Sequence, residues 1–125
     1  MPGLFLIFLG GGTGAVCRFA LNNLVGRVIG TEFPFGTLIV NLLGALLIGG
    51  IVETMAMKLS APGEIRLLLV TGFLGGFTTF SAFSLEAAHM FERGDFLHLT
   101  CYVAASVIGT IALVFLGSWM IRLTL

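Results

Sequence analysis

The sequence predicts an all-α membrane protein whose four transmembrane helices form a single domain over residues 1–125. The first observation is composition, since 58% of the residues are hydrophobic, 10% are charged, and the mean hydropathy is +1.12. A soluble core of this size could not bury so much apolar surface, so the solvent must be lipid. The second observation is length, because about 20 apolar residues span a hydrocarbon core about 30 Å thick. Four such crossings use nearly the whole chain.

Short polar connections divide the chain into four apolar segments, at residues 4–24, 35–57, 65–91 and 96–121. The first segment ends near Asn22 and Asn23. Neither a basic region nor a small-residue cleavage site accompanies it, so we interpret it as a retained span and not as a signal peptide. The second segment begins after Pro34, and the fourth follows a turn at Gly94.

The third segment, residues 65–91, is longer than a straight crossing requires. Glycines and clustered hydroxyls interrupt its apolar pattern between Gly72 and Ser84. The surplus length predicts a helix, a break near residues 75–78, and a second helix. Lipid cannot hydrogen-bond to freed backbone groups, so such a break persists only where protein, water or a bound ion satisfies them. We therefore expect the functional site in this segment.

Basic residues in the connections give little instruction on membrane orientation. Lys58, Arg66 and Arg122 are expected on one side, and Arg27 and Arg93 on the other. This near balance allows insertion in both orientations and pairing as an antiparallel dimer, and it equally allows one orientation set by another factor. A four-helix unit this small has little interior, which favours a pathway built from two copies. The net charge is zero and there is no polybasic run, which argues against nucleic acid as a partner.

Polar side chains recur at helical spacing inside two spans. Tyr102, Ser106 and Thr110 follow one another every four residues, which places three hydroxyls on one helix face. Thr37 and Asn41 have the same spacing in the second span. Hydrogen bonds between helices are the ordinary explanation for any one of these residues. The repeated pattern also predicts a ladder of donors.

Aromatic residues form a stripe in the third span. Phe77, Phe80 and Phe83 recur every three residues, and Ser81 lies among them. Because a phenyl ring has a positive edge, ring edges can contact an anion while excluding water. Ordinary helix packing gives the same spacing.

Charged residues inside the spans discriminate between function classes. Arg18 is the one basic residue well inside a span. It either draws anions into a vestibule or caps carbonyl groups of a neighbouring helix. A proton-coupled cation exporter would need a carboxylate near the centre of a span, and the first span has none. The sequence also lacks the constellations of hydrolases and zinc enzymes, so we do not expect an enzyme.

Three blocks of sequence together resemble the small bacterial fluoride channels, the Fluc or CrcB family, over essentially the whole chain. The blocks are GGGTGAVCR at residues 10–18, GTLIVNLLG at 36–44 and GFLGGFTTFSAFS at 72–84. The resemblance implies a fluoride-selective channel that exports fluoride passively across the bacterial inner membrane and relieves fluoride toxicity. It also implies an antiparallel dual-topology homodimer with two pores and a structural sodium ion at its centre.

The resemblance further assigns roles to individual residues. Phe80 and Phe83 would line the pores with their ring edges, and Asn41 would donate to the anion. The remaining pathway residues would supply polar groups along the route; they are Thr37, Ser81, Tyr102, Ser106 and Thr110. The backbone carbonyls of Gly75 and Thr78 would coordinate sodium, because a hard cation prefers oxygen ligands. The family commonly has Thr where this chain has Ala82, which puts the transport rate in question.

Fluoride is small and strongly hydrated, so a channel must replace its water with donors at close range and still release it. The uncharged donors of the spans suit that task. The main rival is a dual-topology exporter of a drug-like or guanidinium-type cation, and a further alternative is a membrane anchor or assembly subunit that transports nothing.

Overall fold

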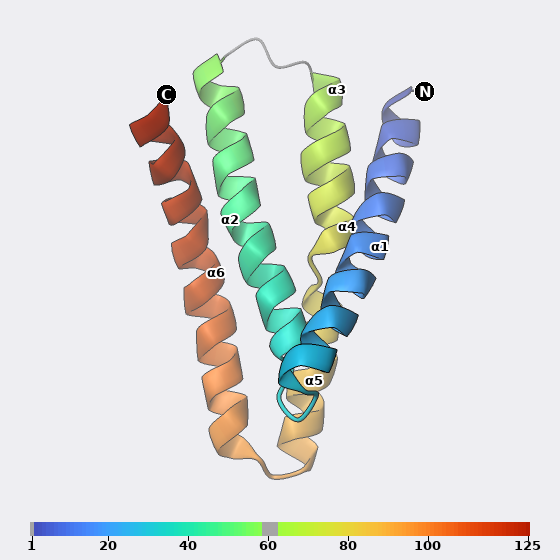
Figure 1. Ribbon diagram of the computed structural model, residues 1–125, viewed down its shortest axis with the longest axis vertical. Helices are drawn as coiled ribbons and strands as arrows, with labels where there is room; N and C mark the ends of the chain where they lie inside the picture. The colour runs from blue at the N-terminus through green and yellow to red at the C-terminus, as the bar shows by residue number, and fades with distance from the viewer. Residues whose placement is uncertain (1, 59–62) are drawn as a thin grey trace.

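A computed structural model describes residues 2–58 and 63–125, and the chain folds into four long helical segments (Figure 1). The elements are α1 (Pro2–Ile29), α2 (Phe35–Lys58), α3 (Gly63–Arg66), the π-helix η1 (Leu67–Leu74), α4 (Gly75–Phe77), α5 (Phe80–Glu92) and α6 (Phe96–Thr124). Within the described residues, four helical segments are long and apolar enough to cross a membrane, and the third combines α3 to α5. This confirms the predicted all-α class with four candidate spans.

The helical segments pack as two pairs. In Figure 1, α2 and α6 run side by side, and α1 lies against the third segment. Both chain ends lie at one end of the molecule, and the turn between α5 and α6 lies at the other. The helix α1 extends past the apolar stretch to Ile29, and the next residue, Gly30, has a positive φ of 103° that suits a residue without a side chain.

Glycines bring α1 into backbone contact with the third segment. A Cβ atom on Gly14 would collide with the carbonyl oxygen of Phe73, and one on Gly76 would collide with that of Gly11. A Cβ atom on Gly10 would lie 2.8 Å from the Phe73 nitrogen. Small residues at helix contacts allow this approach in membrane proteins. These glycines therefore form the close contact between α1 and the third segment.

The pair α2 and α6 is also closely packed. A Cβ atom on Gly49 would collide with the carbonyl oxygen of Val114, and the Ser118 hydroxyl donates to the Gly49 carbonyl at 3.2 Å. Nearer the chain ends, Arg122 Nε donates to Glu53 Oε1 at 2.8 Å. These contacts fix α2 against α6 in the half of the molecule that holds the termini.

The third segment changes backbone conformation at Thr78 and Thr79. The short helix α4 ends at Phe77, and α5 begins at Phe80. Between them Thr78 has φ −85° and ψ 156°, and Thr79 has φ −149° and ψ 116°, both extended. The Thr79 hydroxyl accepts from the Ala82 N–H at 3.1 Å and so caps the start of α5.

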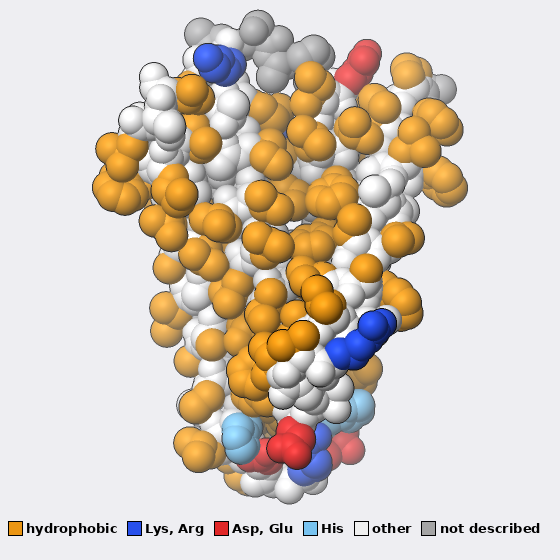
Figure 2. Space-filling view, in the orientation of Figure 1, with side chains coloured by type: hydrophobic (Ala, Val, Ile, Leu, Met, Phe, Trp, Pro, Cys, Tyr) orange, Lys and Arg blue, Asp and Glu red, His pale blue; other side chains and the backbone are white. Residues whose placement is uncertain are grey.

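Buried hydrophobic residues form two small clusters on either side of this point. One contains Val40, Leu74 and Phe77, and the other contains Phe83, Met90 and Tyr102. Most large apolar side chains are instead exposed in the single chain. Figure 2 shows hydrophobic side chains along the length of one face, with most charged side chains near its ends. This distribution suits a protein surrounded by lipid and apolar protein surface.

Candidate functional site

The extended residues between α4 and α5 are held by a side chain from α2. The Thr79 N–H donates to Asn41 Oδ1 at 2.8 Å, and Asn41 Nδ2 donates to the Thr79 carbonyl at 2.9 Å. The first bond satisfies the Thr79 N–H, which lipid would leave without a partner. The second adds a donor to the Thr79 carbonyl, which also begins α5 as its N-cap. An amide nitrogen carries two N–H donors, and the bond to Thr79 uses one of them. Sequence reasoning singled out Asn41 but not the backbone of Thr79.

Arg18 reaches the same region from α1. Its Nε donates to the carbonyl oxygen of Gly76 at 3.1 Å, in a partly buried position. The sequence left two roles open for this residue, and this bond corresponds to the second one, a cap on carbonyl groups of a neighbouring helix.

The two carbonyls expected to bind sodium belong to the first residue of α4, Gly75, and to the residue that follows this helix, Thr78. Gly75 and Thr78 both line a cavity of about 340 Å³, together with Asn41, Phe80 and Thr110. Thr78 itself bonds back to Leu74, with its N–H at 3.0 Å and its hydroxyl at 2.8 Å from the Leu74 carbonyl. Over residues 2–58 and 63–125, no group of three or more His, Cys, Asp and Glu side chains could hold a metal ion.

The two candidate pore phenylalanines are neighbours with different surroundings. Phe83 is 8% exposed and packs against Tyr102, with ring centroids 5.0 Å apart. Phe80 is 76% exposed, and its ring centroid lies 5.4 Å from that of Phe83. Ser81 is also exposed, and its hydroxyl lies 3.2 Å from that of Thr79. Within one chain, only Phe83 belongs to the interior.

The hydroxyls of α6 share one face but differ in their partners. Among the described residues, nothing hydrogen-bonds to the buried Ser106 hydroxyl. The Thr110 hydroxyl donates to the Ser106 carbonyl of its own helix at 2.5 Å. The Tyr102 hydroxyl, fully buried, donates to Glu86 Oε1 at 3.0 Å and also interacts with the buried Thr37 side chain from α2. The face thus contains one unbonded hydroxyl, one that is bonded to its own helix, and one that is bonded to a carboxylate.

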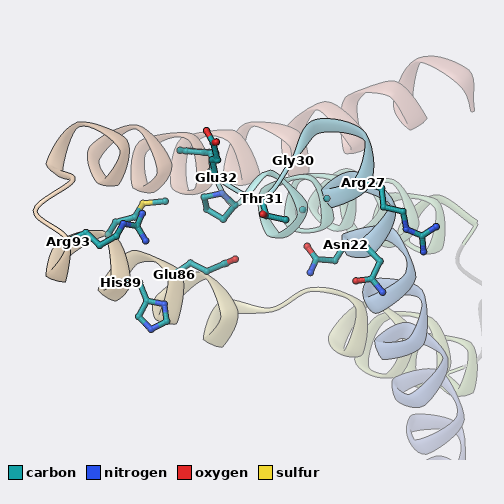
Figure 3. Close-up of a pocket in the computed structure, with 14 residues that line it drawn as sticks. Asn22, Arg27, Gly30, Thr31, Glu32, Glu86, His89 and Arg93 are labelled. Carbon is teal, nitrogen blue, oxygen red and sulfur yellow. The ribbon is translucent and has the colours of Figure 1, made fainter.

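Glu86 connects this face to a polar cavity at the end of the molecule. The cavity has a volume of about 640 Å³ and lies between the end of α1, the connection to α2, and α5. In Figure 3, Glu86 and His89 project from α5, Arg93 projects from the residue that follows it, and Asn22 and Arg27 project from α1. Sequence reasoning did not include Glu86 in the site. The signal was its place three residues after Phe83, in the series of every third residue that Phe77 begins.

The turn between α5 and α6 carries a second charged group near this cavity. His98 Nδ1 lies 2.8 and 2.9 Å from the two carboxylate oxygens of Asp95. This contact, aided by Arg93 at 3.9 Å, lowers the pKa of the Asp95 carboxyl below its usual value. The end of the molecule therefore contains both signs of charge.

Several known proteins that resemble this chain are named as fluoride-specific ion channels. The profile of the family described as CrcB-like protein, Camphor Resistance (CrcB), matches residues 5–118. The fluoride-specific ion channel FluC of Chelativorans sp. (strain BNC1) is 50% identical over 119 residues, which cover 95% of each chain. The protein of the same name in Rhizobium etli (strain CIAT 652) is 48% identical to this chain over 118 residues, which cover 94% of each chain. In Granulibacter bethesdensis the identity is 45% over 122 residues, covering 98% of this chain and 96% of the relative.

Proposed function

We propose that this chain, which belongs to the CrcB-like family, is a fluoride channel that lets fluoride leave the cell passively across the bacterial plasma membrane. The observation that carries this conclusion is 50% identity to a fluoride-specific ion channel over 95% of both chains. Four helical segments of sufficient length and apolarity make it a multi-pass membrane protein. Its activity is ion conduction and not enzymatic chemistry.

The working unit in this proposal is an antiparallel homodimer. Phe80 and Gly75 are exposed in the single chain although they lie in the middle of the third segment, beside the extended residues. A second copy would cover them and complete the central cavity of about 340 Å³. The basic residues support either orientation, because their numbers at the two ends are nearly equal. Three lie at one end, Lys58, Arg66 and Arg122, and two lie at the other.

The anion route would begin in the polar cavity beside Glu86 and continue along the buried hydroxyl face of α6. Phe83 would present its ring edge there, and the unbonded Ser106 hydroxyl would be the first free donor. The Tyr102 hydroxyl has a single donor, which it gives to Glu86, so its use by an anion requires that bond to exchange. The second N–H of Asn41 would serve the anion near the centre.

Further residues that the family resemblance assigns to the pathway would also contribute to this route. Thr110 and Phe80 line the central cavity, Thr37 lies beside Tyr102, and Ser81 lies at the start of α5. All these groups are neutral. Neutral donors can replace the water around a small anion without holding it as strongly as a fixed ammonium would. Such a route favours passage over tight binding.

The structural sodium ion would bind to the carbonyl oxygens of Gly75 and Thr78 at the dimer centre. The donor set fits, because the Thr79 N–H that would otherwise occupy the Gly75 carbonyl is bonded to Asn41. When bound, the ion supplies a positive charge that oxygen ligands from both copies share. Within this chain, Asn41 would keep the Gly75 carbonyl available to it.

The test is fluoride release from liposomes that contain the purified protein, measured with a fluoride electrode. Fluoride should leave electrogenically, without a proton gradient, and chloride should not compete. Proton-coupled uptake of an organic cation without fluoride release would instead support the exporter. If neither is seen and a stable partner copurifies, the anchor interpretation replaces the channel.

A further inference from the structure

Three successive carbonyls near the end of α4, those of Leu74, Gly75 and Gly76, differ in the donor that each one meets. In a continuing α-helix each carbonyl accepts from the N–H four residues later. Leu74 keeps this partner, because the Thr78 N–H lies 3.0 Å from its oxygen. The Gly75 carbonyl loses its partner to Asn41, which takes the Thr79 N–H at 2.8 Å. The extended conformations of Thr78 and Thr79 then carry the next N–H away from the Gly76 carbonyl.

Arg18 occupies the acceptor that this conformation vacates. Its Nε lies 3.1 Å from the Gly76 oxygen and donates to it from a different helix. We propose that Arg18 is a positioning residue of the fluoride pathway, since it replaces the lost helical donor at Gly76 and fixes the direction in which Thr79 and Phe80 leave α4. This inference rests on the proposed channel function.

The chemistry of the guanidinium suits this position. A carbonyl at a helix end inside a membrane lacks water as a donor, and a cation there also complements the negative end of the helix. Arginine remains charged and carries five N–H donors without an acceptor. A single fixed group can therefore satisfy the carbonyl permanently.

The glycine contacts explain how the side chain of Arg18 reaches its target. Gly14 lies one turn before Arg18 on α1 and packs on the Phe73 carbonyl, while Gly76 packs on Gly11. The backbones are therefore close enough for Arg18 to bond directly to Gly76.

The first test compares fluoride efflux from liposomes for Arg18→Met, Arg18→Gln and Arg18→Lys. Loss of a hydrogen bond to a charged group predicts that efflux falls about tenfold or more in Arg18→Met. Gln and Lys each keep an N–H donor, so both should restore part of the rate. If the charge acted only by attracting anions, Gln would be as slow as Met. That result, or full efflux in Arg18→Met, overturns the inference.

The control variant is Arg66→Gln, which removes an exposed positive charge at the start of the third segment. It leaves two basic residues at each end, which still permits both orientations. We expect efflux close to that of the wild type. Failure of the wild type to release fluoride would refute the channel itself, whereas wild-type flux with an unaffected Arg18→Met refutes only the role of Arg18.

A second measurement weakens the acceptor instead of the donor. Phenyllactate in place of Phe77 converts the Gly76 carbonyl into an ester carbonyl, which accepts hydrogen bonds less well. The ester also removes the Phe77 N–H, so part of its effect is expected in any background. It should slow efflux in the wild type by a larger factor than in Arg18→Met, because both changes weaken the same bond to the Gly76 carbonyl. Phenyllactate in place of the exposed Phe8 is the control and should add to Arg18→Met independently.

Additive effects of the Phe77 ester and Arg18→Met would overturn the inference. If Arg18→Met does not assemble, the ester is combined with Arg18→Lys and Arg18→Gln, and the same criterion applies.

Discussion

The Asn41 amide and the Thr79 peptide group pair through two hydrogen bonds, one in each direction, of 2.9 and 2.8 Å. The first residue belongs to α2, and the second lies where the third segment is extended. One side chain thus replaces the helical acceptor that the Thr79 N–H lacks and adds a donor to the Thr79 carbonyl.

Asn41→Leu should slow fluoride efflux at least about tenfold and lower the free energy of unfolding by about 2 kcal/mol, because two net hydrogen bonds disappear. Efflux is measured with the fluoride electrode, and stability is measured by thermal unfolding in detergent. Thr54→Val, which removes only a bond to the carbonyl of Gly50 on the same helix, is the control. Unchanged efflux in Asn41→Leu would remove this amide from the pathway.

The two phenylalanines should separate pathway effects from stability effects. Both Phe80→Ile and Phe83→Ile should suppress efflux without dispersing the proposed dimer. Only Phe83→Ile should also lower the thermal stability, because Phe83 is buried against Tyr102 whereas Phe80 is 76% exposed in the chain. Gel filtration reports assembly. Phe8→Ile, at a ring that is 75% exposed on α1, should change neither property.

Ser106→Ala should leave stability unchanged within about 0.5 kcal/mol and still slow efflux. The reason is that the Ser106 hydroxyl has no partner within the described structure to lose, yet it is the first free donor of the proposed route. Thr110→Val is the companion variant, because it removes a hydroxyl that, unlike that of Ser106, already has a partner in the Ser106 carbonyl. A stability loss in Ser106→Ala without any change in efflux would contradict this assignment.

Gly14→Ala should destabilise the protein by about 1 to 3 kcal/mol or prevent folding, because the added methyl group would meet the Phe73 carbonyl. Gly12→Ala on the same helix has open space around the new methyl group, and it should be neutral or stabilising. Thermal unfolding of both variants provides the comparison. Equal stabilities would show that α1 moves away from the third segment without cost.

Asp95 should make stability depend on pH in the acid range. Its pKa is lowered in the folded protein by His98, so it stabilises the fold above the unfolded pKa, and this contribution is lost as the pH falls through the folded value. Thermal unfolding of the wild type between about pH 6 and pH 3 should show that loss. Asp95→Asn should have a shallower slope, and parallel curves would mean that the contact with His98 contributes nothing.

The sequence predicted the positions of the helices better than the contacts between them. Runs of apolar residues determine where a chain crosses lipid, so four spans followed from composition and spacing. The pairing of Arg18 with Gly76 could not be predicted, because it depends on how closely α1 approaches across 58 residues of chain. The same is true of Glu86, whose role arises from contact with Tyr102 on another helix. Hydroxyl spacing identified the face of α6, but not that Thr110 bonds to its own helix.

The donors from α1 and α2 act on consecutive parts of the third segment, with Arg18 at Gly76 and Asn41 at Thr79. The permeation machinery therefore extends beyond the side chains that an ion touches. A substitution anywhere on α1 that moves this helix slightly would therefore change the conduction rate. In a screen for loss of fluoride resistance, we expect hits on α1 even at positions that face away from the route.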